Sequence, residues 1–182
     1  MIRRVTLVMA LVGLAFAVVA AGEMQKGTTQ KMSMEDMKAG MMKCYVCKNI
    51  AAHMDEFGPM GMETTKLNDG LAVRHWVQSP DPKKVAAFHT ACQAAQQAGQ
   101  ECMSFSDERA QTDLCQYCQG IRSAAKAGAR VSQGETPNGD IMVLTSSDPS
   151  VQMQLTALEQ KCAMMAATID QPMGTSPRAS KN

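Results

Sequence analysis

The chain has 182 residues and a formal net charge of +1, and only 4% of its residues are aromatic. A net charge this close to zero offers no basic face for nucleic acid and no acidic face for a cationic partner. We therefore expect no nucleic-acid partner. Methionine occurs 17 times and cysteine seven times, so these sulfur-containing side chains are the first candidates for a functional role.

The N-terminus has the pattern of a secretory signal peptide. Arg3 and Arg4 precede an apolar run that ends in small side chains. The run is shorter than the roughly 20 residues that a spanning helix usually needs, and small residues suit signal peptidase. We predict a signal peptide over residues 1–21, a periplasmic or secreted protein, and no stable membrane span after cleavage. The polar segments 22–32 and 171–182 are expected to be flexible ends.

The rest of the chain is predicted to contain two copies of one unit, repeat unit 1 over residues 33–100 and repeat unit 2 over residues 101–170. Each copy has a Cys-x-x-Cys pair and a third cysteine further along, and corresponding cysteines are 70 or 71 residues apart. A period this constant is the mark of an internal repeat. The cysteines concerned are Cys44, Cys47 and Cys92 in the first copy and Cys115, Cys118 and Cys162 in the second.

The first copy is predicted to fold as a helix, a β-hairpin and a second helix. Ser33 can cap a helix whose apolar residues recur every three or four positions and include both cysteines of the pair. Two extended runs, residues 62–67 and 71–77, flank an Asn-Asp-Gly turn. Asp81 and Pro82 then begin the second helix, because aspartate caps free amides and proline suits the first helical position.

The second copy repeats these elements in the same order. Ser106 is predicted to begin the first helix, and residues 129–135 and 141–145 form a hairpin around an Asn-Gly turn. Asp148 and Pro149 begin the last helix.

A lone hairpin with two helices is only marginally stable in water, so the two hairpins should pair. We predict an α+β fold, built as a tandem pseudo-symmetric repeat of helix-hairpin-helix units. The hairpins form one four-stranded antiparallel sheet, with the helices packed on it.

The cysteines are predicted to form two soft-metal sites, one in each copy. Thiols at i and i+3 share a helix face, and the antiparallel second helix can bring the third cysteine to them. Three sulfurs with an imidazole suit zinc, whereas three thiolates with methionines nearby suit copper(I). The predicted ligands are Cys44, Cys47, His89 and Cys92 in the first copy and Cys115, Cys118, Glu159 and Cys162 in the second.

Methionines crowd the segment that leads into the first cysteine pair. Met34, Met37 and Met41 fall on the apolar face of the predicted helix, and core packing is the favoured role for them. Met24 and Met32 lie outside that helix and are better candidates for loose contacts with a metal, because thioethers bind soft ions.

Two other roles for the cysteines stay open. Exported proteins often use disulfides as staples, which would make this an interaction or scaffold domain with a protein partner. Seven cysteines cannot all pair within one chain, so at least one thiol, with Cys102 as the extra residue, stays free or pairs between chains. Thiol-disulfide catalysis is least favoured, because both pairs are predicted in mid-helix rather than at a helix start. We expect a binding protein that is not an enzyme.

Overall fold

The computed structural model describes residues 33–168. The predicted signal peptide, N-terminal segment and C-terminal tail lie outside the described residues. The first half contains α1 (Met34–Met42), α2 (Lys48–Ala51), α3 (Met54–Phe57), β1 (Met60–Lys66), β2 (Gly70–Val77) and α4 (Pro82–Glu101). The second half contains the 3-10 helix η1 (Cys102–Ser104), α5 (Asp107–Asp113), α6 (Gln116–Lys126), β3 (Arg130–Thr136), β4 (Gly139–Thr145) and α7 (Pro149–Thr168).

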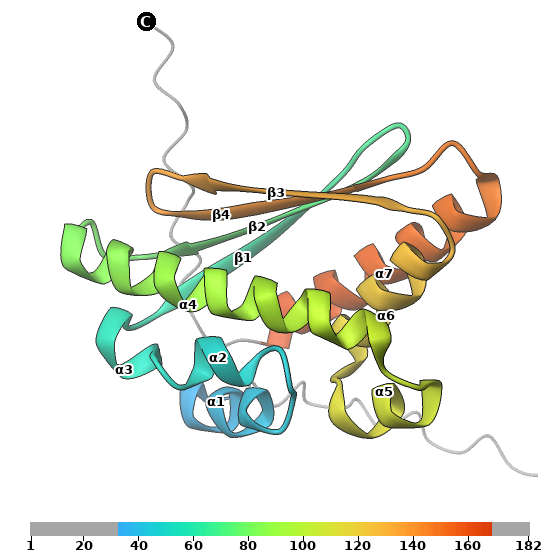
Figure 1. Cartoon of the computed structure of the whole chain (residues 1–182). Coiled ribbons are helices and arrows are strands. Elements are labelled where there is room, and N and C mark those ends of the chain that lie inside the picture. The colour runs from blue at the N-terminus through green and yellow to red at the C-terminus, as the bar shows by residue number, and fades with distance from the viewer. Residues whose placement is uncertain (1–32, 169–182) are drawn as a thin grey trace, which may run out of the picture.

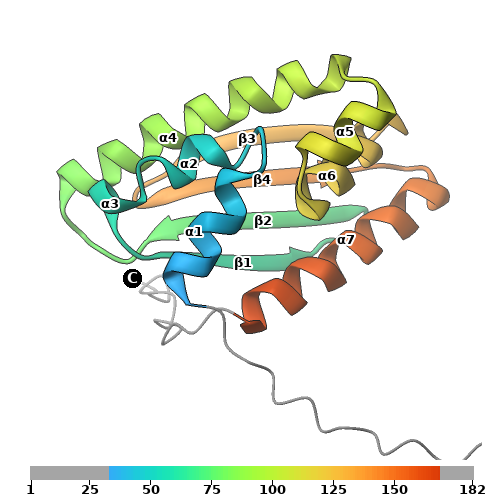
Figure 2. The same ribbon diagram turned by 90° about the horizontal axis from the view of Figure 1, so that it is seen from below.

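The four strands form one antiparallel sheet in the order β1-β2-β4-β3. The inner strands of the two hairpins pair with each other, with Val73 opposite Met142. The labelled helices lie on one face of this sheet (Figures 1 and 2). The predicted α+β architecture, a four-stranded antiparallel sheet with helices packed on it, is confirmed.

The helix starts follow from local capping. The side chain of Asp81 accepts a hydrogen bond from the backbone N–H of Lys83, and Pro82 occupies the first turn. Asp148 accepts in the same way from the N–H of Ser150 at 2.7 Å before α7. These aspartates satisfy amides that a helix N-terminus leaves without partners. The predicted starts of both long helices are therefore confirmed.

The predicted continuous helix through the first cysteine pair is wrong. The helix stops at Met42, and a turn carries Cys44 and Cys47 before α2 begins at Lys48. The predicted helix from Ser106 is broken as well, because α5 ends at Asp113 and Cys115 is the N-cap of α6, so the second pair lies at a helix start and not in mid-helix. Periodicity alone did not reveal either break.

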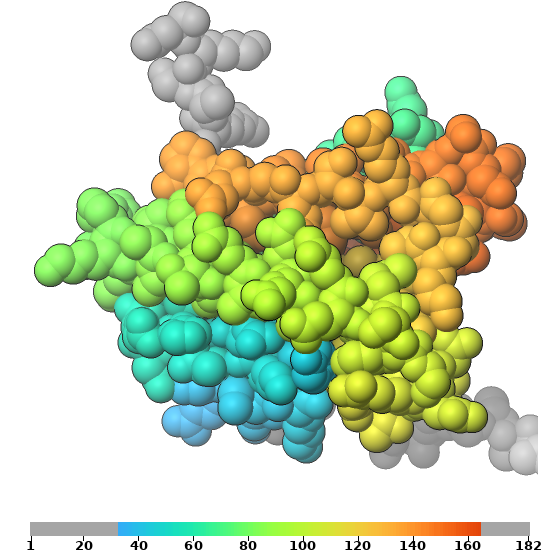
Figure 3. Space-filling view, viewed as in Figure 1, coloured from blue at the N-terminus to red at the C-terminus, as the bar shows by residue number. Residues whose placement is uncertain are grey.

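Each long helix packs chiefly on a strand of the hairpin in the other half of the chain. Helix α7 packs on β1 and β2, whereas α4 packs on β4 and β2. In Figure 3, α4 runs across the front of the molecule, between the sheet above and α1 to α3 below. The largest core joins the sheet to α7 and includes the fully buried side chains of Leu71, Val73, Leu144 and Leu155. This arrangement leaves the start of α6 and the turn after α1 facing each other beneath the middle of the sheet (Figure 2).

Within residues 33–168, no helix combines the length and the apolar character needed to cross a membrane.

Candidate metal centre

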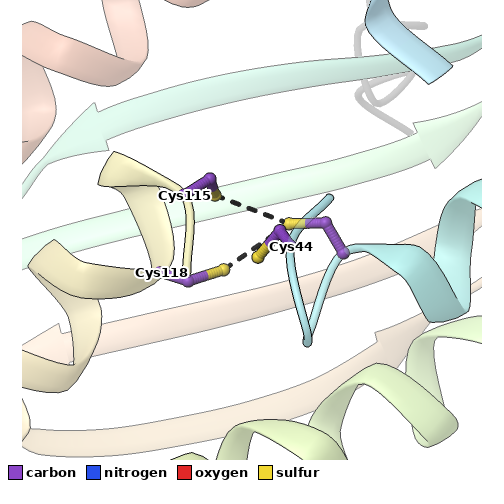
Figure 4. Close-up of side chains that lie close together, drawn as sticks. Cys44, Cys115 and Cys118 are labelled. Atoms are coloured by element: carbon purple, nitrogen blue, oxygen red, sulfur yellow. Dashed lines mark hydrogen bonds between the residues drawn. The ribbon is translucent and has the colours of Figure 1, made fainter. Parts of the chain in front are cut away.

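The two Cys-x-x-Cys segments meet each other and could hold a metal ion. Cys44 and Cys47 lie in the turn between α1 and α2, while Cys115 caps α6 and Cys118 lies in its first turn. The four Sγ atoms all lie within 4.8 Å of one another. The Sγ of Cys47 is 3.7 Å from that of Cys115 and 3.5 Å from that of Cys118. Figure 4 shows the side chains at the start of α6 pointing toward the turn that carries Cys44.

Backbone and side-chain contacts fix the first segment against the second. The backbone N–H of Tyr45 donates to the carbonyl of Asp113 at 2.7 Å. The side chain of Asn49 closes the turn by donating to the carbonyls of Tyr45 and Val46 at 3.2 and 3.0 Å. The ring of Tyr45 packs edge-on against Phe105, with the ring centroids 5.1 Å apart. The cysteine-bearing turn is thus held in place by groups that are not themselves ligands.

The sulfur cluster lies in an apolar shell. Cys44 is 2% exposed and Cys118 is 6% exposed, and both belong to a small core with Phe105 and Leu114. Burial in apolar surroundings disfavours isolated charge. Thiolates in this shell therefore need a counter-charge or hydrogen-bond donors.

Hydrogen bonds within the cluster supply such donors. The Cys118 thiol and backbone N–H donate to the sulfur of Cys115 and lower its pKa to about 7. Hydrogen bonding to the Cys115 side chain, then to the thiols of Cys118 and Cys47, holds the pKa of Cys44 well below its usual range. The pKa of the donating thiols shifts in the opposite direction, because hydrogen bonds to Cys115 raise the pKa of Cys47 and of Cys118. Hydrogen bonding among the four sulfurs thus favours the thiolate form of Cys44 and Cys115 and disfavours it in Cys47 and Cys118.

The structure does not bring Cys92 and His89 into this group. Cys92 is half-buried on α4, where burial and then the neighbouring Asp140 raise its pKa above the usual range. The Nε2 of His89 lies 3.2 Å from the carbonyl of Thr136 and 2.9 Å from that of Gly139. His89 therefore ties α4 to the turn between β3 and β4.

Cys162 and Glu159 also lie outside the group. Cys162 is 0% exposed in the core between α7 and the sheet. Burial, followed by the charge of Glu159, raises its pKa to about 11. Cys102 is buried beside the cluster and donates its thiol hydrogen to the carbonyl of Gly99 at 3.0 Å. These thiols are protonated packing groups in this structure.

The sequence thus identified both cysteine pairs as candidate ligands but assigned each pair a different partner from the one that the structure shows. Each pair was expected to meet the third cysteine of its own copy, whereas the structure brings the two pairs together. The presence of two Cys-x-x-Cys motifs could have predicted this shared site, because two such motifs in one chain are the usual pattern of a four-cysteine metal site.

The methionines occupy the places that favour packing. Met34, Met37 and Met41 pack against the core formed by α3, α4 and the end of β2. Met24 and Met32 lie outside the described residues.

All seven cysteines fall within the described residues, and none of them is joined in a disulfide. No protein-family model, curated protein or solved structure matches the chain. The assignment of a function therefore depends on the chemistry of the four clustered cysteines.

Proposed function

We propose that this is an exported, non-enzymatic metal-binding protein that holds one zinc ion between Cys44, Cys47, Cys115 and Cys118. The observation that carries the proposal is the spacing of the four sulfurs. In a tetrahedral site with Zn–S bonds of about 2.3 Å, neighbouring sulfurs are about 3.8 Å apart. The Sγ atom of Cys47 lies 3.7 Å from that of Cys115 and 3.5 Å from that of Cys118. These distances are close to the expected sulfur–sulfur distance, so a zinc ion would need little rearrangement.

Charge favours zinc over copper(I) as the occupant. Four thiolates carry four negative charges, of which zinc neutralises two and copper(I) only one. The larger residual charge costs more in an apolar shell. Tetrahedral coordination by four sulfurs is also typical of zinc.

Copper(I) is the second candidate, and one observation supports it. Cys47, Cys115 and Cys118 line a cavity whose wall also carries the thioethers of Met37 and Met41. Thioether and thiolate sulfur are the ligands that copper(I) prefers.

A binding role follows from the number of ligands. Catalytic zinc sites keep a coordination position for water or substrate, whereas four cysteines fill all four positions. The metal would join the turn after α1 to the start of α6, two parts of the chain that are far apart in sequence. We therefore propose that the bound metal stabilises the fold by holding these two segments together.

Two parts of the proposal concern the origin and location of the chain. The repeat units 33–100 and 101–170 would derive from one ancestral unit, each contributing one cysteine pair. The predicted signal peptide over residues 1–21 supports a periplasmic or secreted location. In such a compartment disulfide formation competes with metal binding, so thiol state and metal content must be measured together.

The test is metal content in purified protein with matched cysteine variants. The native chain should bind one zinc per molecule under reducing conditions, and Cys44→Ala or Cys115→Ala should abolish stoichiometric binding. Cys92→Ala is the control, because Cys92 is a half-buried cysteine outside the cluster, and it should retain one zinc. Binding that survives Cys115→Ala, or that is lost in Cys92→Ala alone, would contradict the proposed ligands. An oxidised form lighter by two hydrogens per bridge, with no metal uptake after reduction, would support the staple alternative.

A further inference from the structure

A large cavity lies between the sheet and the helices, next to the cysteine cluster. Its volume is about 620 Å³, within the range of about 300–1,000 Å³ typical of pockets for small molecules. Its wall combines residues from α1, α4, α6 and all four strands. The cavity is open to solvent on one side, so a ligand could enter it.

The wall of the cavity is mostly apolar and deformable. Methionine side chains are flexible and polarizable, so they adapt to ligands of irregular shape. Six of them line the cavity: Met37, Met41, Met60, Met62, Met103 and Met142.

The apolar lining continues to the surface. Met103 is 38% exposed and Val131 is 39% exposed, and both line the cavity. The exposed glutamines Gln96 and Gln100 on α4 also line it. A polar and apolar rim of this kind gives a ligand a route from solvent into the cavity.

The charged side chains in the wall already have partners. Arg122 donates to the carbonyls of Cys102 and Phe105 and to the carboxylate of Asp107. Asp140 lies 3.2 Å from the Nδ1 of His75. An ionic ligand would have to compete with these interactions and lose its own hydration, which is costly. The wall therefore favours an uncharged ligand.

One polar group in the wall lacks a partner. Tyr117 lines the cavity, and its hydroxyl is buried without a hydrogen-bond partner in the described part of the chain. Buried hydroxyls are rarely left unpaired. This oxygen has almost no accessible surface, even toward the cavity, so it gives a ligand no polar anchor in this structure.

We propose that this cavity binds an uncharged, predominantly apolar small molecule. Cys47, Cys115 and Cys118 form part of the wall, so the ligand would lie beside the metal centre. The proposal depends on the cavity and its lining and not on the presence of a metal.

The test uses two fluorescent probes that share an anilinonaphthalene ring system. N-phenyl-1-naphthylamine is uncharged, and 8-anilinonaphthalene-1-sulfonate carries a sulfonate. The uncharged probe should bind saturably, one molecule per chain, with a dissociation constant of about 10 µM or below. The sulfonate should bind at least tenfold more weakly. Absence of saturable binding by the uncharged probe, or equal affinity for the sulfonate, would overturn the proposal.

A substitution series at Gly99 locates the binding site. Gly99 lies on α4 in the cavity wall, and an added Cβ would meet nothing within 4 Å. Gly99→Ala and Gly99→Leu should therefore fill the cavity progressively, with leucine weakening probe binding at least tenfold. Both residues favour a helix over glycine, so a melting temperature at or above the native value would show that the fold is retained.

Gly134→Leu is the matched control. Gly134 lies on β3 outside the cavity, and an added Cβ there also meets nothing within 4 Å. This variant should bind the probe as the native protein does. Unchanged affinity in Gly99→Leu, or equal weakening in Gly134→Leu, would overturn the assignment of the cavity. Metal content measured on the same samples should stay native throughout, so a failure of the cavity proposal is distinguishable from a failure of metal binding.

Discussion

The buried side chain of Arg122 is expected to stabilise the segment that precedes the second cysteine pair. It is 5% exposed, and its Nε donates to the carbonyl of Cys102 at 3.0 Å while Nη2 donates to that of Phe105. Arg122→Met keeps an apolar stem of similar length but removes both donors. The carbonyl of Cys102 would keep a second donor, the backbone N–H of Phe105 at 3.2 Å, whereas the carbonyl of Phe105 would lose its bond to Arg122. A buried carbonyl left without a donor costs about 1–3 kcal/mol, so we expect the free energy of unfolding to fall by about 1–3 kcal/mol.

The ion pair of the same arginine serves as the internal control. Its Nη1 lies 2.9 Å from Asp107, whose side chain is 74% exposed. Water screens the exposed carboxylate, and the amide oxygen of an asparagine at this position could still accept a hydrogen bond from Nη1. Asp107→Asn should therefore change stability far less than Arg122→Met. Urea unfolding of metal-loaded protein measures both variants. The reasoning would be refuted by a loss below 1 kcal/mol in Arg122→Met, or by equal losses in the two variants.

Three further predictions concern close packing, thiol reactivity and pH. Gly70→Ala should destabilise by about 3 kcal/mol, because the added Cβ would overlap sterically with the backbone carbonyl oxygen of Leu144 in the paired strand. Cys162, with a pKa of about 11, should have only about one thiolate in a thousand at pH 8 and resist iodoacetamide until the protein unfolds. Zinc affinity should decrease as the pH is lowered. The slope of log affinity against pH should become steeper below about pH 7, because Cys115 is then protonated and must lose its proton when the metal binds.

Each of these predictions has an outcome that would contradict it. Gly134→Ala is the packing control and should be neutral or stabilising by up to about 0.5–1 kcal/mol, so equal destabilisation by both glycine variants would remove the steric explanation. Rapid labelling of Cys162 in folded protein, followed by peptide mass spectrometry, would show that it is not buried. A slope that stays constant from pH 8 to pH 6 in competition titrations would mean that the protonation of Cys115 does not contribute.

The local features of the fold could be predicted because short-range chemistry decides them. The Asp-Pro pairs at Asp81 and Asp148 identified the starts of both long helices, and the turn sequences identified both hairpins. Pairing of the hairpins followed from the instability of a lone hairpin. Each of these inferences needs only neighbouring residues and a general rule of stability.

The partners of the cysteine pairs could not be predicted from spacing. Periodicity shows which residues share one face of their own segment, but it does not show what that face meets. The meeting of Cys47 with Cys115 depends on the order β1-β2-β4-β3 and on the turn that interrupts the helix after Met42. Cys92 had suitable spacing, yet α4 turns it toward Asp140 instead. Long-range packing therefore selected one four-cysteine group over the two expected sites.

The most direct test of the metal centre is X-ray absorption spectroscopy at the zinc edge on reduced, zinc-loaded protein. The proposed site predicts four sulfur neighbours at about 2.3 Å and no nitrogen or oxygen ligand in the first coordination sphere. Cys92→Ala should give the same spectrum, because Cys92 is not a proposed ligand. A sphere with three or fewer sulfurs, or with nitrogen or oxygen at about 2.0–2.2 Å, would contradict coordination by Cys44, Cys47, Cys115 and Cys118.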